Sequence, residues 1–254
     1  MRSVLFLLMF LLFTAGVTAQ NNHPLSCRFK HYFIIGDMDS WLALVDSLQE
    51  QQLSKVENDV LLQAQYGLMG YFLSQNRKER AAQQYQYFEK NLNSVLKIFP
   101  QNPEYLAMKA ASYGFEIGMS PIKAPFLNSK HLQSINRALQ NRNNCAFPLI
   151  EQGNSLFFRP PIVGGNKNKA VEYYEQAVQI LEKQQCCNWL YFSISSWLGQ
   201  VYTKMGEPEK SFAMYKKLLA IEPEFEYVKD ELLPQLQNGE YVDMGAKLEN
   251  NLLK

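Results

Sequence analysis

Apolar side chains recur every three or four residues along most of this chain, which is the spacing of one face of an α-helix. Clusters of proline, glycine and asparagine interrupt the pattern at short intervals. The segments between these breaks pair into antiparallel helical hairpins. We expect four such hairpins, over residues 58–99, 103–141, 146–185 and 188–223.

Three further segments outside the hairpins also have helical spacing. They cover residues 37–48, 224–236 and 240–253. Asp37 can cap the first of them, and Pro234 should bend the second. The pattern therefore predicts about eleven helices and no strand. Each hairpin needs its neighbours to bury its apolar stripe, so residues 37–254 should fold as one array whose last two segments cover its end.

The N-terminal residues have the pattern of a secretory signal peptide. Arg2 supplies a positive start, the apolar run Val4–Phe13 follows, and Ala19 ends a small-residue cleavage site. An uncleaved anchor is the alternative, although the apolar run is short for a membrane span. We therefore expect residues 1–19 to be a signal peptide and the mature protein to be secreted or periplasmic, in a bacterial cell envelope, without a stable membrane span. Residues 20–36 are expected to be a poorly ordered leader.

The hairpin over residues 188–223 carries a recurring order of small, aromatic and proline residues. They are Leu198, Gly199, Tyr202, Ser211, Tyr215 and Pro223. Gly199 permits the close approach of a neighbouring helix, and Pro223 stops the second helix. This order resembles the tetratricopeptide repeat, a helix-turn-helix unit of about 34 residues. Ser195 and Leu218 depart from the family pattern, which has a large aromatic residue and an alanine at these places.

The resemblance implies a fold and a function. The fold is an all-α superhelix of about four helix pairs with terminal capping helices, and the function is a non-enzymatic scaffold for a protein or peptide partner. The stretch PPIVGGNKNKAVEYYEQA, which begins at Pro160, is also similar to the T-component proteins associated with TRAP transporters. That likeness implies an alternative, a small-ligand-binding component of envelope transport. An open concave surface would favour the scaffold, and an enclosed apolar cavity with a few polar groups would favour the ligand-binding component.

Charge and motif content narrow the function further. The chain has 25 Lys and Arg residues against 24 Asp and Glu residues, so its net charge is +1. It therefore has no basic field that would attract nucleic acid or anionic lipid. No nucleophile, general base and oxyanion site can be nominated together, so we expect neither enzyme activity nor a cofactor.

Two stretches admit both a ligand-binding and a structural interpretation. Gly164–Lys167 precedes a helix and resembles a phosphate cradle. A turn with glycines at positive φ, followed by Asn166 as the helix cap, accounts for the same residue types. His23, Cys27 and His31 would align as metal ligands on a helix, but a solvated tail is the better interpretation because no fourth ligand is evident.

Three cysteines support a disulfide prediction. Cys145 begins the first helix of the third hairpin, and Cys186 and Cys187 end its second helix. These two ends lie at the same edge of an antiparallel hairpin. We therefore expect a disulfide from Cys145 to Cys186 or Cys187, formed in an oxidising compartment.

Two hairpins have enlarged turns, Ser120–Asn128 and Arg159–Gly165. Insertions in a repeat array map to one side of it, often the side that binds, and the prolines in both turns limit the entropy lost on binding. The candidate binding residues in these turns are Ile122, Lys123, Phe126, Arg159, Ile162 and Val163. The alternative is that these loops pack over the array and seal its core.

Overall fold

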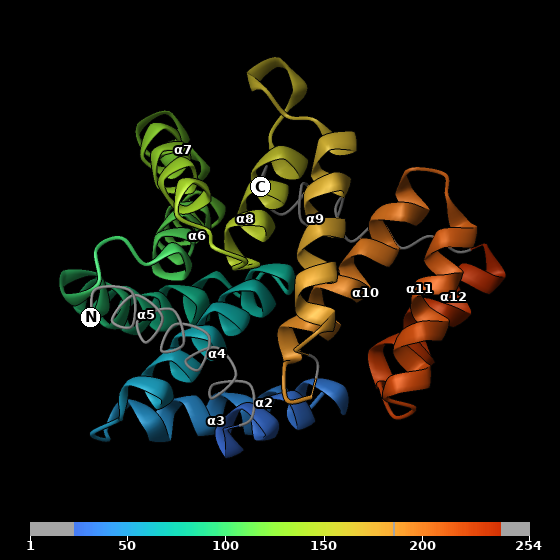
Figure 1. Ribbon diagram of the computed structural model, residues 1–254, viewed down its shortest axis with the longest axis horizontal. Helices are drawn as coiled ribbons and strands as arrows, with labels where there is room; N and C mark the ends of the chain where they lie inside the picture. The colour runs from blue at the N-terminus through green and yellow to red at the C-terminus, as the bar shows by residue number, and fades with distance from the viewer. Residues whose placement is uncertain (1–22, 185, 240–254) are drawn as a thin grey trace, which may run out of the picture.

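The chain folds as a set of paired helices (Figure 1). A computed structural model describes residues 23–184 and 186–239, and these residues form eleven α-helices and no strand. The α-helices are α2 (Pro24–Ile34), α3 (Met38–Gln49), α4 (Lys55–Ser74), α5 (Lys78–Ile98), α6 (Pro103–Met119), α7 (Ala124–Gln140), α8 (Phe147–Phe158), α9 (Lys167–Glu182), α10 (Trp189–Lys204), α11 (Pro208–Ile221) and α12 (Leu233–Asn238). Two 3-10 turns, η1 (Pro121–Lys123) and η2 (Pro161–Val163), and the π-helical segment η3 (Tyr227–Leu232) complete them.

The four predicted hairpins are confirmed. Helices α4 and α5, α6 and α7, α8 and α9, and α10 and α11 pack as consecutive pairs. Figure 1 shows these pairs following one another around an arc, with α2 and α3 below them. The first helix of each pair also contacts the preceding pair, as α6 does with α4 and α5, and α10 does with α9. The architecture is therefore the expected all-α array of helix pairs.

Short polar side chains determine where several first helices begin. Ser54 caps α4 and forms a reciprocal capping box with Glu57. Asn102 accepts hydrogen bonds from the first backbone N–H groups of α6, and Asn188 does the same for α10. Each cap satisfies an N–H group that has no partner within the helix, which fixes the start of the helix.

Glycine permits the closest contacts within the third and fourth pairs. A Cβ atom at Gly199 would lie 2.3 Å from Cε1 of Tyr215, and one at Gly153 would lie 2.5 Å from Cε1 of Tyr174. Both tyrosine rings are buried. The predicted close approach of a neighbouring helix at Gly199 is confirmed, and Tyr202 is also buried. In the third pair, Gly153 and Tyr174 make the equivalent contact.

Residues 24–34 correct the prediction of a poorly ordered leader. They form α2, which starts at Pro24 and is capped by the imidazole of His23. Phe29 is fully buried, and Phe33 packs on Trp189 and Phe225, with ring centroids 5.7 and 5.5 Å away. The segment is ordered because its aromatic side chains fill the space between the first and fourth pairs.

The disulfide prediction is wrong in its partner. Cys187 is bonded to Cys27 of α2, whereas Cys145 and Cys186 are free. Cys145 is half-buried, and burial raises the pKa of its thiol. The bond joins α2 to the loop before α10, 160 residues along the chain. The hairpin argument missed it because it considered only cysteines within one pair.

Helix α4 makes contacts that a linear repeat array would not have. A Cβ atom at its Gly67 would lie 2.9 Å from Cη2 of Trp189 and 3.1 Å from Cζ2 of Trp41. The neighbouring Tyr66 contacts Phe147 of α8, with ring centroids 5.3 Å apart. The array therefore curves back until its first pair touches its third and fourth. These contacts between pairs that are not consecutive go beyond the expectation that each hairpin buries its apolar stripe against its neighbours.

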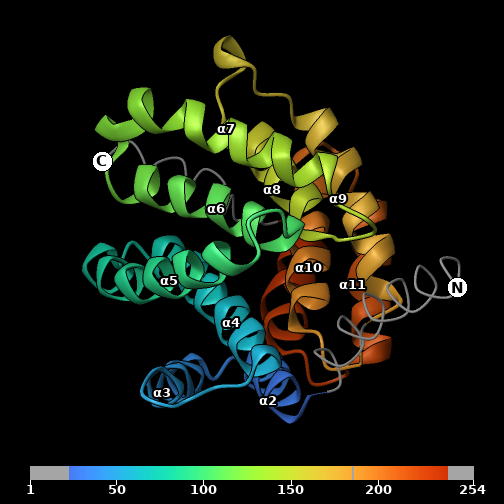
Figure 2. The ribbon, with the colours of Figure 1, turned by 60° about the vertical axis from the view of Figure 1, so that its left-hand side comes forward.

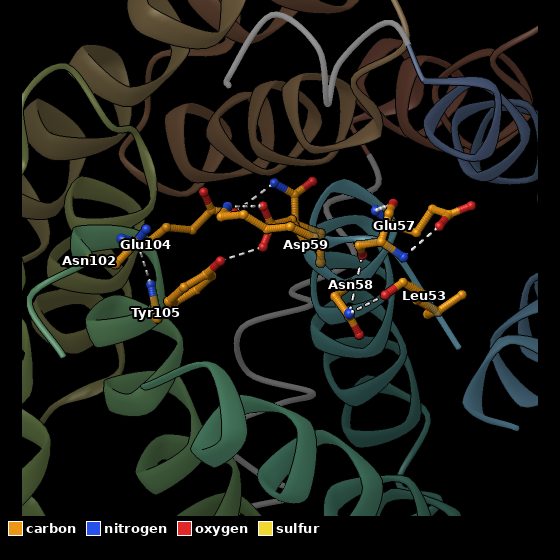
Figure 3. A network of polar contacts seen from close by, with 10 residues as sticks. Leu53, Glu57, Asn58, Asp59, Asn102, Glu104 and Tyr105 are labelled. Carbon is orange, nitrogen blue, oxygen red and sulfur yellow. Dashed lines mark hydrogen bonds and ion pairs between the residues drawn. The ribbon is translucent and has the colours of Figure 1, made fainter. Parts of the chain in front are cut away.

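A polar network joins the first and second pairs (Figure 3). Asp59 of α4 accepts a hydrogen bond from the hydroxyl of Tyr105 and pairs with Lys55 at 2.8 Å. Glu104 accepts a hydrogen bond from the amide of Gln63 at 2.8 Å. Because these groups lie in the first half of α4 and at the start of α6, the network sets the position of α6 against α4.

The C-terminal prediction can be compared only in part. Residues 224–236 were expected to form a helix bent at Pro234, and they contain η3 followed by α12, in whose first turn Pro234 lies. The predicted helix over residues 240–253 and the predicted signal peptide over residues 1–19 lie outside the described residues.

Candidate functional site

The four first helices line a large groove on the inner side of the array. Its volume is ≈ 1890 Å³. Side chains from α4, α6, α8 and α10 line it, together with α7, the loop after α8 and η3, and α7 contributes more lining residues than any other helix. The second helices of the first, third and fourth pairs contribute no residue to the lining. The groove therefore lies on the side of the array formed by the first helix of each pair and, in the second pair, by both helices. Figure 2 shows how these helices are arranged.

Aromatic side chains form much of the groove wall. Phe158 stacks on Trp197, with ring centroids 5.7 Å apart and an interplanar angle of 23°. Tyr66 lies edge-on to Phe147 and contacts Phe115 with ring centroids 5.5 Å apart. Half-buried aromatic rings of this kind offer large, rigid contact areas to a ligand.

A buried carboxyl lies in the groove wall. Glu151 of α8 is 3% exposed, and its Oε1 accepts hydrogen bonds from the Tyr66 hydroxyl at 2.6 Å and from the Asn154 amide at 3.1 Å. The Tyr174 hydroxyl donates to the Asn154 Oδ1 at 2.8 Å. Burial raises the pKa of Glu151 to about 7, although the two hydrogen bonds stabilise the carboxylate and act to lower this pKa. This network connects the first helix pair to the third in the wall of the groove.

One end of the groove has basic and imidazole groups. His131 of α7 is buried, and its Nδ1 donates to the carbonyl oxygen of Ala110 at 2.8 Å. Burial lowers the pKa of His131, which keeps the ring neutral at physiological pH. Arg159 lies nearby and donates to the Ser155 hydroxyl. Arg137 donates to the carbonyl of Pro100 at 3.2 Å.

The other end of the groove is acidic. Glu226, Asp230 and Glu231 line it from η3 and the residue before it, and all three are exposed. Among the described residues, none of these three carboxylates forms a salt bridge. Lys229 stands between them in sequence but pairs with Glu224 at 3.2 Å.

The structure divides the six predicted binding residues into two groups. Arg159 and Val163 line the groove. Ile122, Phe126 and Ile162 are outside it and are 81%, 76% and 93% exposed. The alternative that these loops seal the core is wrong for those three side chains. Lys123 also lies outside the groove and pairs with Glu116 at 2.6 Å.

The first of the two enlarged turns is smaller than expected. After η1, helix α7 begins at Ala124, whereas the sequence pattern placed the helix start near Ser129. Pro125 lies in the first turn of α7, where its missing N–H leaves no hydrogen bond unmade. The prolines of this stretch suggest a loop, but a proline in the first turn of a helix is compatible with that helix.

The structure supports the structural interpretation of the Gly164–Lys167 stretch. Gly164 has φ +94°, and Asn166 caps α9 by accepting a hydrogen bond from the N–H of Lys169 at 3.0 Å. Gly165 is required for a different reason, because a Cβ atom there would lie 1.8 Å from the carbonyl oxygen of Arg159. The residues therefore build a tight turn into α9.

The suggested metal ligands have other partners. Cys27 is in a disulfide, and His23 caps α2. Within residues 23–184 and 186–239, no three His, Cys, Asp or Glu side chains are placed to hold a metal ion. In the same residues, no helix combines the length and apolar character needed to cross a membrane.

Comparison with known proteins identifies the repeat. The family model of the tetratricopeptide repeat matches residues 194–225. Residues 194–225 are thus similar to one tetratricopeptide repeat. The matched residues contain most of α10 and all of α11, so the sequence resemblance of this pair is confirmed. The likeness to TRAP-associated T-component proteins receives no support from the comparisons.

One similar solved structure is titled "Crystal structure of MamA protein". It shares 22% sequence identity with this chain at a TM-score of 0.40, over 73% of this chain and 90% of that chain. A TM-score this low does not support an argument about function. No curated protein matches this chain.

Sequence reasoning missed most of the groove. The predicted binding residues were in the two enlarged turns, whereas the groove residues Glu151, Trp197 and Tyr66 lie within first helices. The sequence did contain a signal for these residues. In a tetratricopeptide pair, some residues of the first helix face neither the second helix nor the next pair. The acidic end could not have been placed, because η3 reaches the groove only through the curvature of the whole array.

Proposed function

We propose that this chain is a non-enzymatic interaction scaffold that binds a peptide segment of a partner protein in its groove. The observation that carries the proposal is the groove itself, lined by the first helices of all four pairs. The tetratricopeptide unit over residues 194–225 supports it, because such units are used for binding proteins. The proposal needs no cofactor and no nucleic acid.

Groove size favours a peptide over a small molecule. Pockets for small ligands and cofactors usually have about 300–1,000 Å³. The groove has ≈ 1890 Å³, which exceeds this range. The alternative of a small-ligand-binding component of envelope transport is therefore less well supported.

A test of the groove uses Gly70 of α4. This glycine lines the groove, and a Cβ atom there would meet nothing within 4 Å, so Gly70→Trp can fill the groove without disturbing α4. The matched control is Gln83→Trp, at an exposed position on the outer helix α5. Peptides selected from a random library against the wild-type chain should bind Gly70→Trp at least about tenfold more weakly, a loss of about 1.4 kcal/mol. They should bind Gln83→Trp unchanged. Equal affinity for all three proteins contradicts the proposal.

We further propose that the exposed apolar side chains in η1, at the start of α7 and in η2 extend the contact surface. Ile122, Phe126 and Ile162 lie close in sequence to groove-lining residues at these places. Replacing both Phe126 and Ile162 with Ser should leave the melting temperature unchanged, since both side chains are exposed. The double replacement should weaken the binding of the selected peptides or of a captured partner. A large loss of stability with binding retained contradicts this role.

We also propose a secreted or periplasmic location. The pattern of residues 1–19 supports it, and so does the Cys27–Cys187 disulfide, because disulfides persist mainly in oxidising compartments. The mature protein should begin at Gln20 when its N-terminus is read by mass spectrometry. An intact Met1 in a cytosolic fraction contradicts this location.

A further inference from the structure

Charge is distributed unequally along the groove. Glu226, Asp230 and Glu231 gather at one end, and Arg159 lies at the other, beside the neutral ring of His131. Arg137 is already bonded to the carbonyl of Pro100. The three carboxylates are exposed and, within the described part of the chain, form no salt bridge. Lys229, the nearest cation to Glu226 and Asp230 in sequence, is hydrogen-bonded to Glu224 instead.

We infer that the groove takes a basic, apolar peptide segment of a partner protein, with its Lys or Arg side chains at the end formed by Glu226, Asp230 and Glu231. This inference rests on the proposed function and adds the chemistry and the direction of the bound segment. The apolar side chains of the segment lie against the stacked rings of Phe158 and Trp197, which line the groove.

Electrostatic complementarity supports this partner. Carboxylates arranged along one stretch of a groove produce a negative potential that attracts and orients cationic groups. Aromatic rings beside them add a second attraction, because lysine and arginine bind the faces of Trp and Tyr rings. Tyr227 lines the groove next to Glu226, and Trp189 lies in the adjacent wall. An acidic segment would meet repulsion at this end of the groove.

The opposite end supports a fixed direction. Arg159 would repel a second cationic group, whereas it would accept a carboxylate. His131 adds no charge to that end. The segment should therefore lie with its basic residues toward η3 and its uncharged or acidic residues toward the loop after α8.

The test uses three synthetic peptides of about ten residues, a length that spans about 33–36 Å when extended. All contain the same leucine and tryptophan residues, and their polar positions are lysine in one, glutamine in the second and glutamate in the third. Affinity is measured by fluorescence anisotropy with the full chain. The groove variant carries Glu226→Gln, Asp230→Asn and Glu231→Gln. The control variant carries Glu50→Gln, Glu79→Gln and Glu209→Gln, which are exposed and outside the groove.

The wild-type chain should bind the lysine peptide about tenfold more tightly than the glutamine peptide, and the glutamate peptide more weakly still. The groove variant should lose this preference, while the control variant, which has the same net charge, should keep it. Added salt should reduce the preference in the wild-type chain. Equal loss in both variants, or tighter binding of the glutamate peptide, overturns the inference.

Failure of the inference can be distinguished from failure of the proposed function. If the glutamine or glutamate peptide binds best and Gly70→Trp blocks it, the groove binds peptides but not basic ones. If Gly70→Trp changes no affinity for any peptide, the groove is not the binding site and both proposals fail.

Discussion

Glycine at two buried positions decides how closely the helices of the last two pairs approach. Gly199 and Gly153 each lie against a tyrosine ring, at distances that leave no room for a Cβ atom. Because Tyr215 is held on all sides in the core, its ring cannot move aside without disturbing α11. The contact is therefore a sensitive test of the packing within a pair.

Gly199→Leu should lower the free energy of unfolding by about 1–3 kcal/mol, because it overpacks the contact with Tyr215. Gly70→Leu is the matched control, since Gly70 is also within a helix but a Cβ atom there meets nothing within 4 Å. The control should be neutral or stabilising by up to about 1 kcal/mol, through the better helix propensity of leucine. Urea unfolding measures both, and an unchanged midpoint for Gly199→Leu contradicts the packing.

Glu151 should give stability a pH dependence. Its folded-state pKa of about 7 is above the unfolded value near 4.5, so the folded state binds the proton more tightly. Stability from this group should fall as pH rises from about 4.5 to about 7, by up to about 3 kcal/mol. Glu151→Gln keeps a side chain that can accept a hydrogen bond from Tyr66 but cannot ionise. The variant should therefore lack this contribution to the pH dependence of stability.

The comparison must be made between the two proteins at each pH. Burial also raises the pKa of Glu104 to about 7, and that carboxyl contributes its own slope in both. Parallel stability curves for the wild-type chain and Glu151→Gln between about pH 4 and about pH 8 would contradict the role given to Glu151.

Most helices could be predicted from the sequence, because each carries its own apolar stripe and its own caps. The four pairs and the tight contact at Gly199 followed from that local information. Helix α2 was missed although Leu25, Phe29 and Phe33 stand four residues apart, which is helical spacing. The segment was expected to be poorly ordered because it follows the predicted cleavage site, although its periodicity is helical. A short helix of this kind is stable only when packed against others, which the sequence does not reveal.

The Cys27–Cys187 disulfide should be important for the attachment of α2. Closing a loop with a sequence separation of 160 residues lowers the entropy of the unfolded chain, which corresponds to a stabilisation of up to roughly 5 kcal/mol. Cys27→Ser with Cys187→Ser should therefore lower the midpoint of urea unfolding strongly, and Cys145→Ser should not. Peptide mapping without reductant should recover Cys27 linked to Cys187. Recovery of a Cys145 disulfide contradicts the structure.

At the scale of the whole molecule, curvature creates the site. The contacts of Gly67 with Trp189 and of Tyr66 with Glu151 join helices that are far apart in sequence. Repeat patterns predict which helices pair, but the rotation from one pair to the next depends on side chains at each interface, such as Asp59 with Tyr105. The groove and its charged ends therefore could not be predicted from the sequence, although its helices could.

Carbene footprinting of the full chain, with and without a saturating selected peptide, tests the central claim that partners bind in the groove. Side chains that line the groove and are half-buried, Tyr71, Phe158 and Tyr227, should be labelled less when the peptide is bound. Tyr87 and Phe212, which are exposed on the outer helices α5 and α11, should be labelled equally in both states. Protection of Tyr87 or Phe212 with unchanged labelling of the three groove residues would contradict the account.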